Sequence, residues 1–275
     1  MPKKLLFLCL SLLLALPAGA QSFTLLSWNI QDLGRSKDTA EVAAIVELLR
    51  DYDLVVIQEV VAKDPAGAQT VARIADELNR KGEKWDSRIS PPTQSPSSHK
   101  SERYAILWKT ARLDLLGAPW LDSALAMHCV REPYLARFRL RGSGKPFFLA
   151  NFHSRKFDER PEEEIRHFAD YPQRLQTERV FIAGDFNLDE QHRVWQALYR
   201  QGFAPALRRT PTTLKQKCDA RGNYFNHAID NIYFPEAHFQ VICAGRVDFV
   251  GSCEALAVAR GISDHVPVFL EVKEK

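Results

Sequence analysis

Apolar residues in the first third of the chain alternate between strand-like runs and helical spacing. Dense apolar runs over residues 23–30 and 54–57 are typical of buried strands. Between them, apolar residues recur every three or four positions, at Val42, Ile45, Val46 and Leu49. Asp38 and Glu41 form a capping-box signal at the start of this helix. A second amphipathic helix is predicted over residues 71–78.

Farther along, apolar segments alternate with polar connections. Residues 90–101 contain three prolines and predict a surface loop. Apolar runs predict strands at residues 104–108, 113–116, 134–140, 146–152, 180–183, 229–234 and 266–272. Helices are predicted at residues 162–169 and 193–200, and a turn at residues 141–144 predicts a hairpin. Because these elements are mixed, without a repeat or linker, the pattern favours one α/β domain of two packed sheets covered by helices.

The first twenty residues differ from the rest of the chain. A basic start, an apolar run over residues 5–16 and the small residues Ala18-Gly-Ala20 are typical of a secretory signal peptide. The alternative is a membrane anchor, but the run is shorter than the roughly 20 residues that cross a bilayer. We therefore expect a cleaved signal peptide at residues 1–20, a folded domain at residues 21–275 without a membrane span, and a secreted or periplasmic location.

The overall charge limits how the protein could bind a polyanion. The net charge of +3 falls to +1 without the signal peptide, because Lys3 and Lys4 are lost and 35 basic residues then face 34 acidic ones. A protein that binds nucleic acid through bulk charge is usually more basic. Any binding of nucleic acid would therefore depend on a local basic patch.

Four cysteines follow the signal peptide, at Cys129, Cys218, Cys243 and Cys253. In an oxidising compartment they allow two disulfides in three possible connectivities, which the sequence cannot distinguish. Cys243 and Cys253 form the most local pair. No C-x-x-C spacing occurs among the four, so metal binding by the cysteines is not favoured.

Polar side chains lie at the ends of several predicted strands, where loops usually place catalytic groups on a rigid scaffold. They are Asn29, Glu59, His153, Asp185, Asn187, Asp230, Asp264 and His265. Carboxylate and amide oxygens suit Mg²⁺, Mn²⁺ or Ca²⁺, whereas a zinc site would use more histidine or cysteine. Each residue alone is more often a turn former, a helix cap or an ordinary histidine. Their combination, in this order, favours a catalytic site.

The chain resembles the endonuclease/exonuclease/phosphatase superfamily in six ordered segments, SWNI, IQEV, NFHS, GDFN, AIDN and ISDHVP. It is most similar to the deoxyribonuclease I branch, which Ser101-Glu-Arg-Tyr104 and Arg131-Glu-Pro133 also match. The resemblance spans about residues 23–272. It implies a four-layer α/β sandwich of two mixed β-sheets packed face to face, with helices outside. It also implies a divalent-metal-dependent phosphodiesterase, which the signal-peptide pattern predicts to be exported. With no sign of oligomerisation or a stable protein partner we expect a monomer.

The resemblance assigns one group of residues to the metal ion and the attacking water. Glu59 would be the principal metal ligand, with Asn29 and Asp264 beside it. Mg²⁺ is the expected ion, and Mn²⁺ or Ca²⁺ are alternatives. The metal would neutralise phosphate charge and polarise the phosphorus centre. Asp230 would fix the imidazole of His265 while that imidazole takes a proton from water.

A second group would act on the leaving group and the phosphate. Glu102 and His153 would form another carboxylate–imidazole pair that protonates the leaving oxygen or holds the phosphoryl group. Asp185 and Asn187 would orient the nucleophile or hydrogen-bond the phosphate oxygens, and Arg131 would add a positive charge. Which histidine is the acid and which the base stays open.

The chain departs from the deoxyribonuclease pattern at two positions. Where that branch has an arginine and an aromatic residue that engage the DNA minor groove, this chain has Val61 and Lys100. Lys100 and Arg155 remain candidates for binding substrate, as parts of a basic rim comprising His99, Lys100, Arg103, Arg155 and Lys156. The alternative is that this rim is an ordinary solvated surface.

Three functions remain open from the sequence. The first is a DNA endonuclease that hydrolyses phosphodiesters by metal-assisted attack of water. The second uses the same chemistry on a phospholipid or inositol phosphate. The third is a catalytically silent binding protein on the same scaffold, which the filled catalytic positions disfavour. The substrate, the preferred metal and the strand preference are not encoded in a readable pattern.

Overall fold

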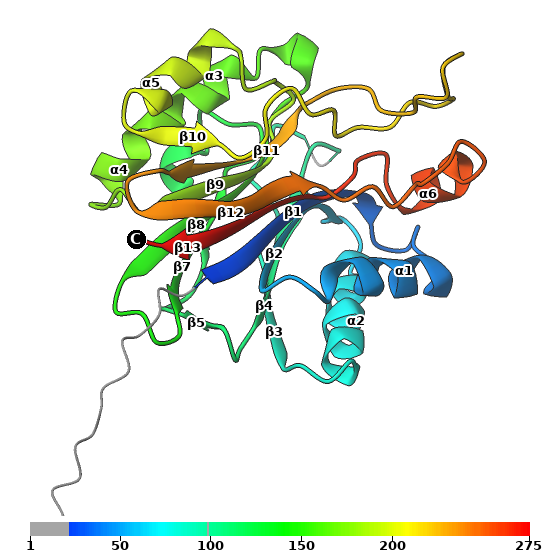
Figure 1. Ribbon diagram of the computed structural model, residues 1–275, viewed down its shortest axis with the longest axis horizontal. Coiled ribbons are helices and arrows are strands. Elements are labelled where there is room, and N and C mark those ends of the chain that lie inside the picture. The colour runs from blue at the N-terminus through cyan, green and yellow to red at the C-terminus, as the bar shows by residue number, and fades with distance from the viewer. Residues whose placement is uncertain (1–21, 98) are drawn as a thin grey trace, which may run out of the picture.

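The computed structural model describes residues 22–97 and 99–275. In that part of the chain, two mixed β-sheets pack face to face and helices cover their outer surfaces (Figure 1). The six-stranded sheet has the order β12-β13-β1-β2-β4-β3, with β1 (Ser22–Leu33), β2 (Leu54–Val61), β3 (Trp85–Ile89), β4 (Glu102–Lys109), β12 (Phe239–Arg246) and β13 (Val268–Glu274). The second sheet has the order β10-β11-β9-β8-β7-β5, and β6 pairs with β7 beside it. Its strands are β5 (Leu113–Leu115), β6 (Trp120–Leu121), β7 (Tyr134–Leu140), β8 (Pro146–His153), β9 (Val180–Asp185), β10 (Phe203–Pro205) and β11 (Asp230–Pro235). The predicted four-layer sandwich is confirmed.

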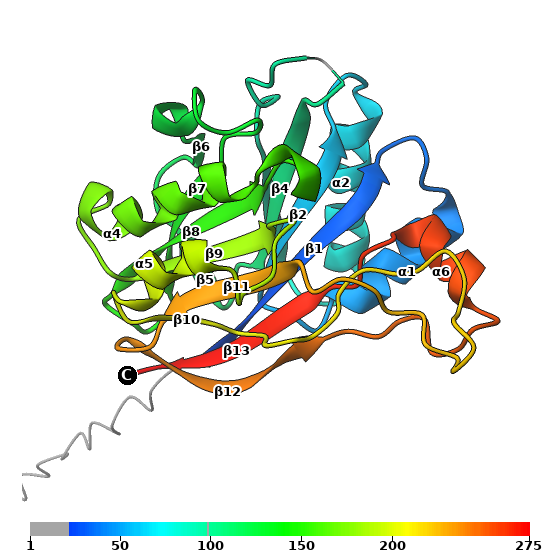
Figure 2. The ribbon, with the colours of Figure 1, turned by 90° about the horizontal axis from the view of Figure 1, so that it is seen from above.

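Helices cover each sheet on its outer face (Figure 2). The side of the six-stranded sheet has α1 (Thr39–Leu49), α2 (Ala66–Arg80) and α6 (Leu256–Ile262). The side of the second sheet has α3 (Glu162–Ile165), α4 (Tyr171–Arg174) and α5 (Gln196–Tyr199), with short 3₁₀ turns η1 (Ser123–Leu125), η2 (Phe157–Glu159), η3 (Arg166–Asp170) and η4 (Arg193–Trp195). The capping box at α1 is formed, since Asp38 accepts a hydrogen bond from the backbone of Glu41 at 2.8 Å.

The period-two alternation of β1 divides its side chains between two cores. Phe23 and Leu25 face the opposite sheet, where Phe23 stacks on Phe147 with ring centroids 5.1 Å apart. Leu26 and Trp28 face the other way and pack under α1 and α2. A strand buried on both faces has a continuous apolar sequence, which explains why the sequence predicts β1 so clearly.

Several elements differ from the predicted ones. The sequence gives no prediction for β3, β6, β10, β12, α4 or α6. The predicted helix at 162–169 is the α-helical turn α3 followed by η3, and that at 193–200 is η4 followed by α5. The predicted hairpin is confirmed, because β7 and β8 pair antiparallel across residues 141–145.

The disulfide differs from the most local pairing. Cys218 is bonded to Cys253, and in the described part of the chain Cys129 is a buried free thiol and Cys243 an exposed one. The pairing joins the long connection between β10 and β11 to the segment before α6, which are distant in sequence. The predicted signal peptide at residues 1–20 lies outside the described residues. None of the described helices is long and apolar enough to cross a membrane.

Candidate active site

The predicted site residues meet at one edge of the sandwich, where strands of both sheets end. In the second sheet, Asp185 at the end of β9 pairs in register with His153 at the end of β8 and with Asp230 at the start of β11. In the other sheet, Asn29 lies in register with Gln58, one residue before Glu59. Facing sheets therefore bring together side chains that are far apart in sequence.

The backbone leaves regular strand geometry at the residues that enter the site. Glu59, Asp32 and Asn187 have φ angles of 60°, 50° and 48°, a region that non-glycine residues rarely adopt. At Glu59 the pairing of β2 with β4 shifts register between Ile57 and Val60, which is a β-bulge. A bulge redirects a side chain, and strained residues of this kind cluster at functional sites. The bulge turns Glu59 toward the pocket.

Gly184 allows β8 and β9 to approach closely just before the site. A Cβ atom at this position would lie 1.8 Å from the carbonyl oxygen of Phe152, and the φ angle is 153°. A residue with a side chain would therefore push apart the strand ends that present His153 and Asp185. The glycine of the GDFN segment is explained by this contact.

His153 is held by a buried carboxylate. Its Nδ1 lies 3.0 Å from Oε2 of Glu102, and its backbone N–H donates to the Tyr104 hydroxyl at 3.2 Å. Nε of Arg131 lies 3.5 Å from the same carboxylate and donates to the His153 carbonyl at 3.1 Å. Burial and Arg131 act to lower the pKa of His153, but Glu102 and Asp185 raise it above its ordinary value.

His265 is held in the same way from the other side of the site. Its Nδ1 lies 2.9 Å from Oδ2 of Asp230, and that oxygen also accepts a hydrogen bond from the Thr212 hydroxyl at 2.6 Å. The His265 carbonyl accepts a hydrogen bond from the Trp28 indole at 2.9 Å. Burial opposes a charge on the imidazole, but Asp230 and Asp185 raise the pKa of His265 to about 10.

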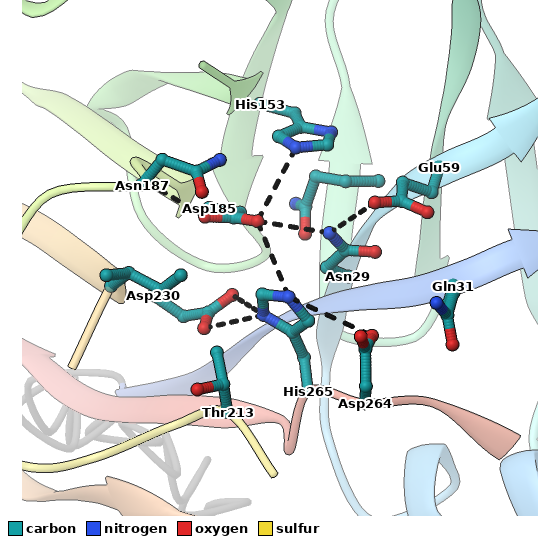
Figure 3. Close-up of polar contacts among 12 residues, drawn as sticks. Asn29, Gln31, Glu59, His153, Asp185, Asn187, Thr213, Asp230, Asp264 and His265 are labelled. Carbon is teal, nitrogen blue, oxygen red and sulfur yellow. Dashed lines mark hydrogen bonds and ion pairs between the residues drawn. The ribbon is translucent and has the colours of Figure 1, made fainter. Parts of the chain in front are cut away.

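Asp185 lies between the two imidazoles, as Figure 3 shows. Its Oδ2 lies 3.5 Å from Nε2 of His153 and 3.7 Å from Nε2 of His265. Asn29 donates to the same oxygen at 3.1 Å, and the Asn187 backbone donates to the other oxygen at 2.9 Å. Burial would raise the pKa of Asp185, but the two imidazoles lower it below its ordinary value. Both histidines thus have Nδ1 on a carboxylate and Nε2 directed to one centre.

An oxygen-rich group lies beside this centre. Asn29 donates its amide to Oε1 of Glu59 at 2.9 Å, yet its buried Oδ1 has no hydrogen-bond partner among the described residues. Asp264 is nearby, 4.0 Å from Nε2 of His265 and partly exposed. An orphaned buried oxygen next to a carboxylate is the chemistry that a hard divalent cation satisfies. Glu59 and Asn29 therefore offer donors that fit such an ion.

Asp185, Asp230 and His265 also bring ligand atoms within 4.8 Å of one another, so a metal could bind there. However, Nδ1 of His265 already contacts Asp230, and the same carboxylate also accepts from Thr212. These contacts satisfy the groups without an ion. The unpartnered oxygen of Asn29 has no such explanation.

A pocket of about 310 Å³ opens above these groups. Its acidic and histidine floor includes Glu59, Glu102, His153, Asp185 and His265. Its walls include basic side chains, namely Lys63, His99, Lys100, Arg131 and Lys156. A pocket with a basic rim and titratable groups at its floor is suited to binding and hydrolysing a phosphate ester.

The predicted basic rim is only partly available to a ligand. Lys100 lines the pocket but its ammonium group lies 2.8 Å from Glu159. Arg155 is not among the residues that line the pocket, and its guanidinium contacts buried Glu164 at 3.0 Å and the His128 carbonyl at 3.1 Å. Arg155 therefore braces two loops in this structure.

A sequence model of the Endonuclease/Exonuclease/phosphatase family matches residues 26–265. The chain belongs to this family. Membership agrees with the fold and with the position of the site at the strand ends. It supports hydrolysis of ester bonds as the class of chemistry.

Several proteins that are similar in sequence to this chain are named deoxyribonucleases. The chain is 30% identical to a deoxyribonuclease of Thioalkalivibrio sp. (strain K90mix) over 94% of its own length and 73% of the relative. It is 33% identical to deoxyribonuclease-1-like 1 of Sus scrofa over 66% of its own length and 58% of that protein. A solved family member from Bacteroides vulgatus shares the fold with a TM-score of 0.65 and 16% identity, over 93% of this chain and all of that one.

Three residues of this chain that the sequence analysis did not predict hold the catalytic side chains or the two sheets in place. Gln58 and Asn151, both fully buried, join the two sheets below the site through a hydrogen bond of 2.6 Å. Thr212 orients Asp230, as described above. Gln58 and Asn151 stand inside the IQEV and NFHS segments, and a polar residue within an apolar strand is the signal that could have identified them. Thr212 lies in a long connection and gives no such signal.

Proposed function

We propose that this protein is an exported, divalent-metal-dependent endonuclease that hydrolyses phosphodiester bonds in DNA. The observation that supports this most directly is the pair of imidazoles that face Asp185 from opposite sides of the site. Each has Nδ1 on a buried carboxylate, which fixes its orientation, and Nε2 directed into the pocket. The deoxyribonuclease relatives support DNA as the substrate. The disulfide supports an oxidising compartment.

Glu59, Asn29 and Asp264 would hold the metal ion in this proposal. The ion would neutralise phosphate charge and polarise the phosphorus centre. Mg²⁺ is the proposed ion because the donors are carboxylate and amide oxygens, and Mn²⁺ or Ca²⁺ could use the same set. The orphaned Oδ1 of Asn29 supports this assignment.

The protein groups would divide the proton transfers between them. His153, held by Glu102 with a raised pKa, would carry a proton and donate it to the leaving oxygen. The Asp185 carboxylate, whose Oδ2 lies 3.7 Å from Nε2 of His265, would take the proton of the attacking water, because His265 is already protonated. In the metal-free protein His265 keeps its proton, which also suits it to bind phosphate.

The remaining predicted residues would shape the pocket and bind the substrate, without taking part in proton transfer. Asn187, at a strained φ of 48°, presents its side chain beside the centre and would donate to a phosphate oxygen. Arg131 lines the pocket, and its charge stabilises the ionised form of Glu102. Lys100 would reach substrate only by leaving Glu159.

A second candidate is hydrolysis of a phospholipid or inositol phosphate by the same groups. Two residues favour it: the groove-inserting positions of the deoxyribonuclease branch are Val61 and Lys100 here, and Lys100 is engaged by Glu159. Neither side chain can insert into the groove of a DNA duplex as an arginine or an aromatic ring does.

The two candidates are distinguished by substrate. Purified protein with Mg²⁺, Mn²⁺ or Ca²⁺ should nick and degrade plasmid DNA, and a chelator should abolish the activity. Intact plasmid together with hydrolysis of sphingomyelin or an inositol phosphate would reject the nuclease and support the second candidate. Inactivity towards every phosphoester despite bound metal would reject both in favour of a binding role.

A further inference from the structure

A second cavity adjoins the active-site pocket and has no role in the chemistry described so far. Its volume is about 340 Å³, and it shares Ala62, Lys63 and Ser101 with the pocket. The rest of its wall belongs to the proline- and serine-rich loop between β3 and β4, with Pro92, Thr93, Ser95 and Ser97. A ligand bound over the catalytic groups can therefore continue into it.

Hydrogen bonds fix several residues of this loop that line the cavity. The Thr93 hydroxyl contacts that of Ser95 at 2.9 Å and accepts from the Glu102 backbone at 3.1 Å, while the Ser101 hydroxyl donates to the Thr93 carbonyl at 3.0 Å. Both oxygens of Glu132, which is 1% exposed, accept from the backbone N–H of Gln94. The wall of the second cavity is preorganised, which reduces the entropy lost when a ligand binds.

Lys63 supplies a positive charge at the boundary of the two cavities. Two other basic side chains of the pocket are paired, Lys100 with Glu159 and Arg131 with Glu102. The neighbouring Asp64 contacts Arg35 at 3.0 Å. Lys63 is exposed and has no ion-pair partner within the part of the chain that the structure describes. Its ammonium group is free to bind an anion.

The lining of the second cavity is suited to a phosphate of a nucleic-acid backbone. It has one cation, Lys63, and four hydroxyl-bearing residues, without a carboxylate among the described residues that line it. The Ser95 and Ser101 hydroxyls already donate to backbone carbonyls, which leaves Lys63 and Ser97 to contact an anion. Lysine and hydroxyl side chains are the groups that contact phosphate and sugar oxygens in nucleic-acid complexes.

We propose that the second cavity binds the phosphate adjacent to the one being cleaved, with Lys63 neutralising its charge. The inference rests on the proposed nuclease function and deepens it, because it makes the site specific for a chain of phosphodiesters. Binding of the DNA backbone by Lys63 would compensate for the absence of groove-inserting side chains at Val61 and Lys100.

The test compares Lys63→Ala with Lys84→Ala, which removes the same charge from an exposed position after the far end of α2. Two substrates are used: a single-stranded oligodeoxynucleotide, and bis(4-nitrophenyl) phosphate, which has a single phosphate. Lys63→Ala should lower kcat/KM on the oligonucleotide about fivefold to tenfold. The slope of log affinity against log salt should fall by about 1. Activity on the small diester should not change, and Lys84→Ala should behave as wild type on both.

The inference is overturned if Lys63→Ala cleaves the oligonucleotide as well as Lys84→Ala does, or if it loses the same factor on the small diester. The first outcome means that Lys63 does not bind the backbone, and the second that it acts on the reacting phosphate itself. Both leave the nuclease function intact. Failure of that function would instead appear as wild-type protein that cleaves no oligonucleotide.

Discussion

Asp185 is the residue at which the two halves of the site meet. Its position depends on Gly184, which lets β9 approach β8, and on the Asn187 N–H and the Asn29 amide, which fix its two oxygens. At the residue scale, the protonation of each histidine depends on the carboxylates that contact it. Two imidazoles share one carboxylate between their Nε2 atoms, and each has a further carboxylate at Nδ1.

Replacing Gly184 with alanine should destabilise the protein by about 3 kcal/mol or more, because the new Cβ would overlap the Phe152 carbonyl oxygen. Urea unfolding followed by circular dichroism measures the change. Gly144→Ala is the control, since a Cβ there meets no atom within 4 Å. Equal stability of the two variants would contradict the close approach of β8 and β9.

The charge on His265 should depend on Asp230. In metal-free protein the His265 imidazole should keep its proton at neutral pH and lose it near pH 10, since its pKa is raised to about 10. In Asp230→Asn the carboxylate that favours the charged form is gone while burial remains, so the pKa should fall. NMR titration of the imidazole resonances measures both values. A wild-type pKa near the ordinary value of about 6.5, or one unchanged by the substitution, would be inconsistent with the ion pair.

At the scale of elements, apolar pattern predicts the strands and helices that bury a continuous face, such as β1 and α1. The sequence does not reveal β12, an edge strand whose middle residues are exposed, because half-exposed strands lack a dense apolar run. The positive φ of Glu59 follows from a register shift between β2 and β4. Register is set by pairing partners that are distant in sequence, so no local pattern encodes the bulge.

The disulfide braces an element that positions the site. Cys218 lies in the long connection between β10 and β11, whose Thr213 and Leu214 pair with the segment containing Asp264 and His265. Sequence spacing leaves the pairing open, because Cys218 and Cys253 become neighbours only when this connection folds back.

Removing the disulfide should lower the free energy of unfolding by about 2 to 4 kcal/mol, since the cross-link no longer restricts the unfolded chain. The double variant Cys218→Ser/Cys253→Ser should therefore unfold at lower urea concentration than wild type. Cys243→Ser, which changes an exposed free thiol, should unfold like wild type. A double variant as stable as this control would show that the connection does not need the bond.

At the scale of the whole molecule, the site exists only where the two sheets meet. One sheet contributes Asn29, Glu59 and Glu102, and the other contributes His153 and Asp185. The buried pair Gln58 and Asn151 fixes the sheets against each other just below. Residue types and their order are readable in the sequence through family resemblance. The distances between these side chains cannot be predicted from the sequence, because they depend on how the two sheets pack.

The central claim is that metal-dependent cleavage of DNA requires the oxygen group at Glu59 and the imidazole of His265 together. The most direct measurement is the rate of plasmid nicking with Mg²⁺ by wild type, Glu59→Gln and His265→Gln, after circular dichroism has established that all three fold. Glu236→Gln and His238→Gln, in the turn between β11 and β12, are the matched controls. We expect each site variant to lose at least about 100-fold in rate and the controls to retain it. Nicking by a folded Glu59→Gln or His265→Gln protein at the wild-type rate would contradict the account.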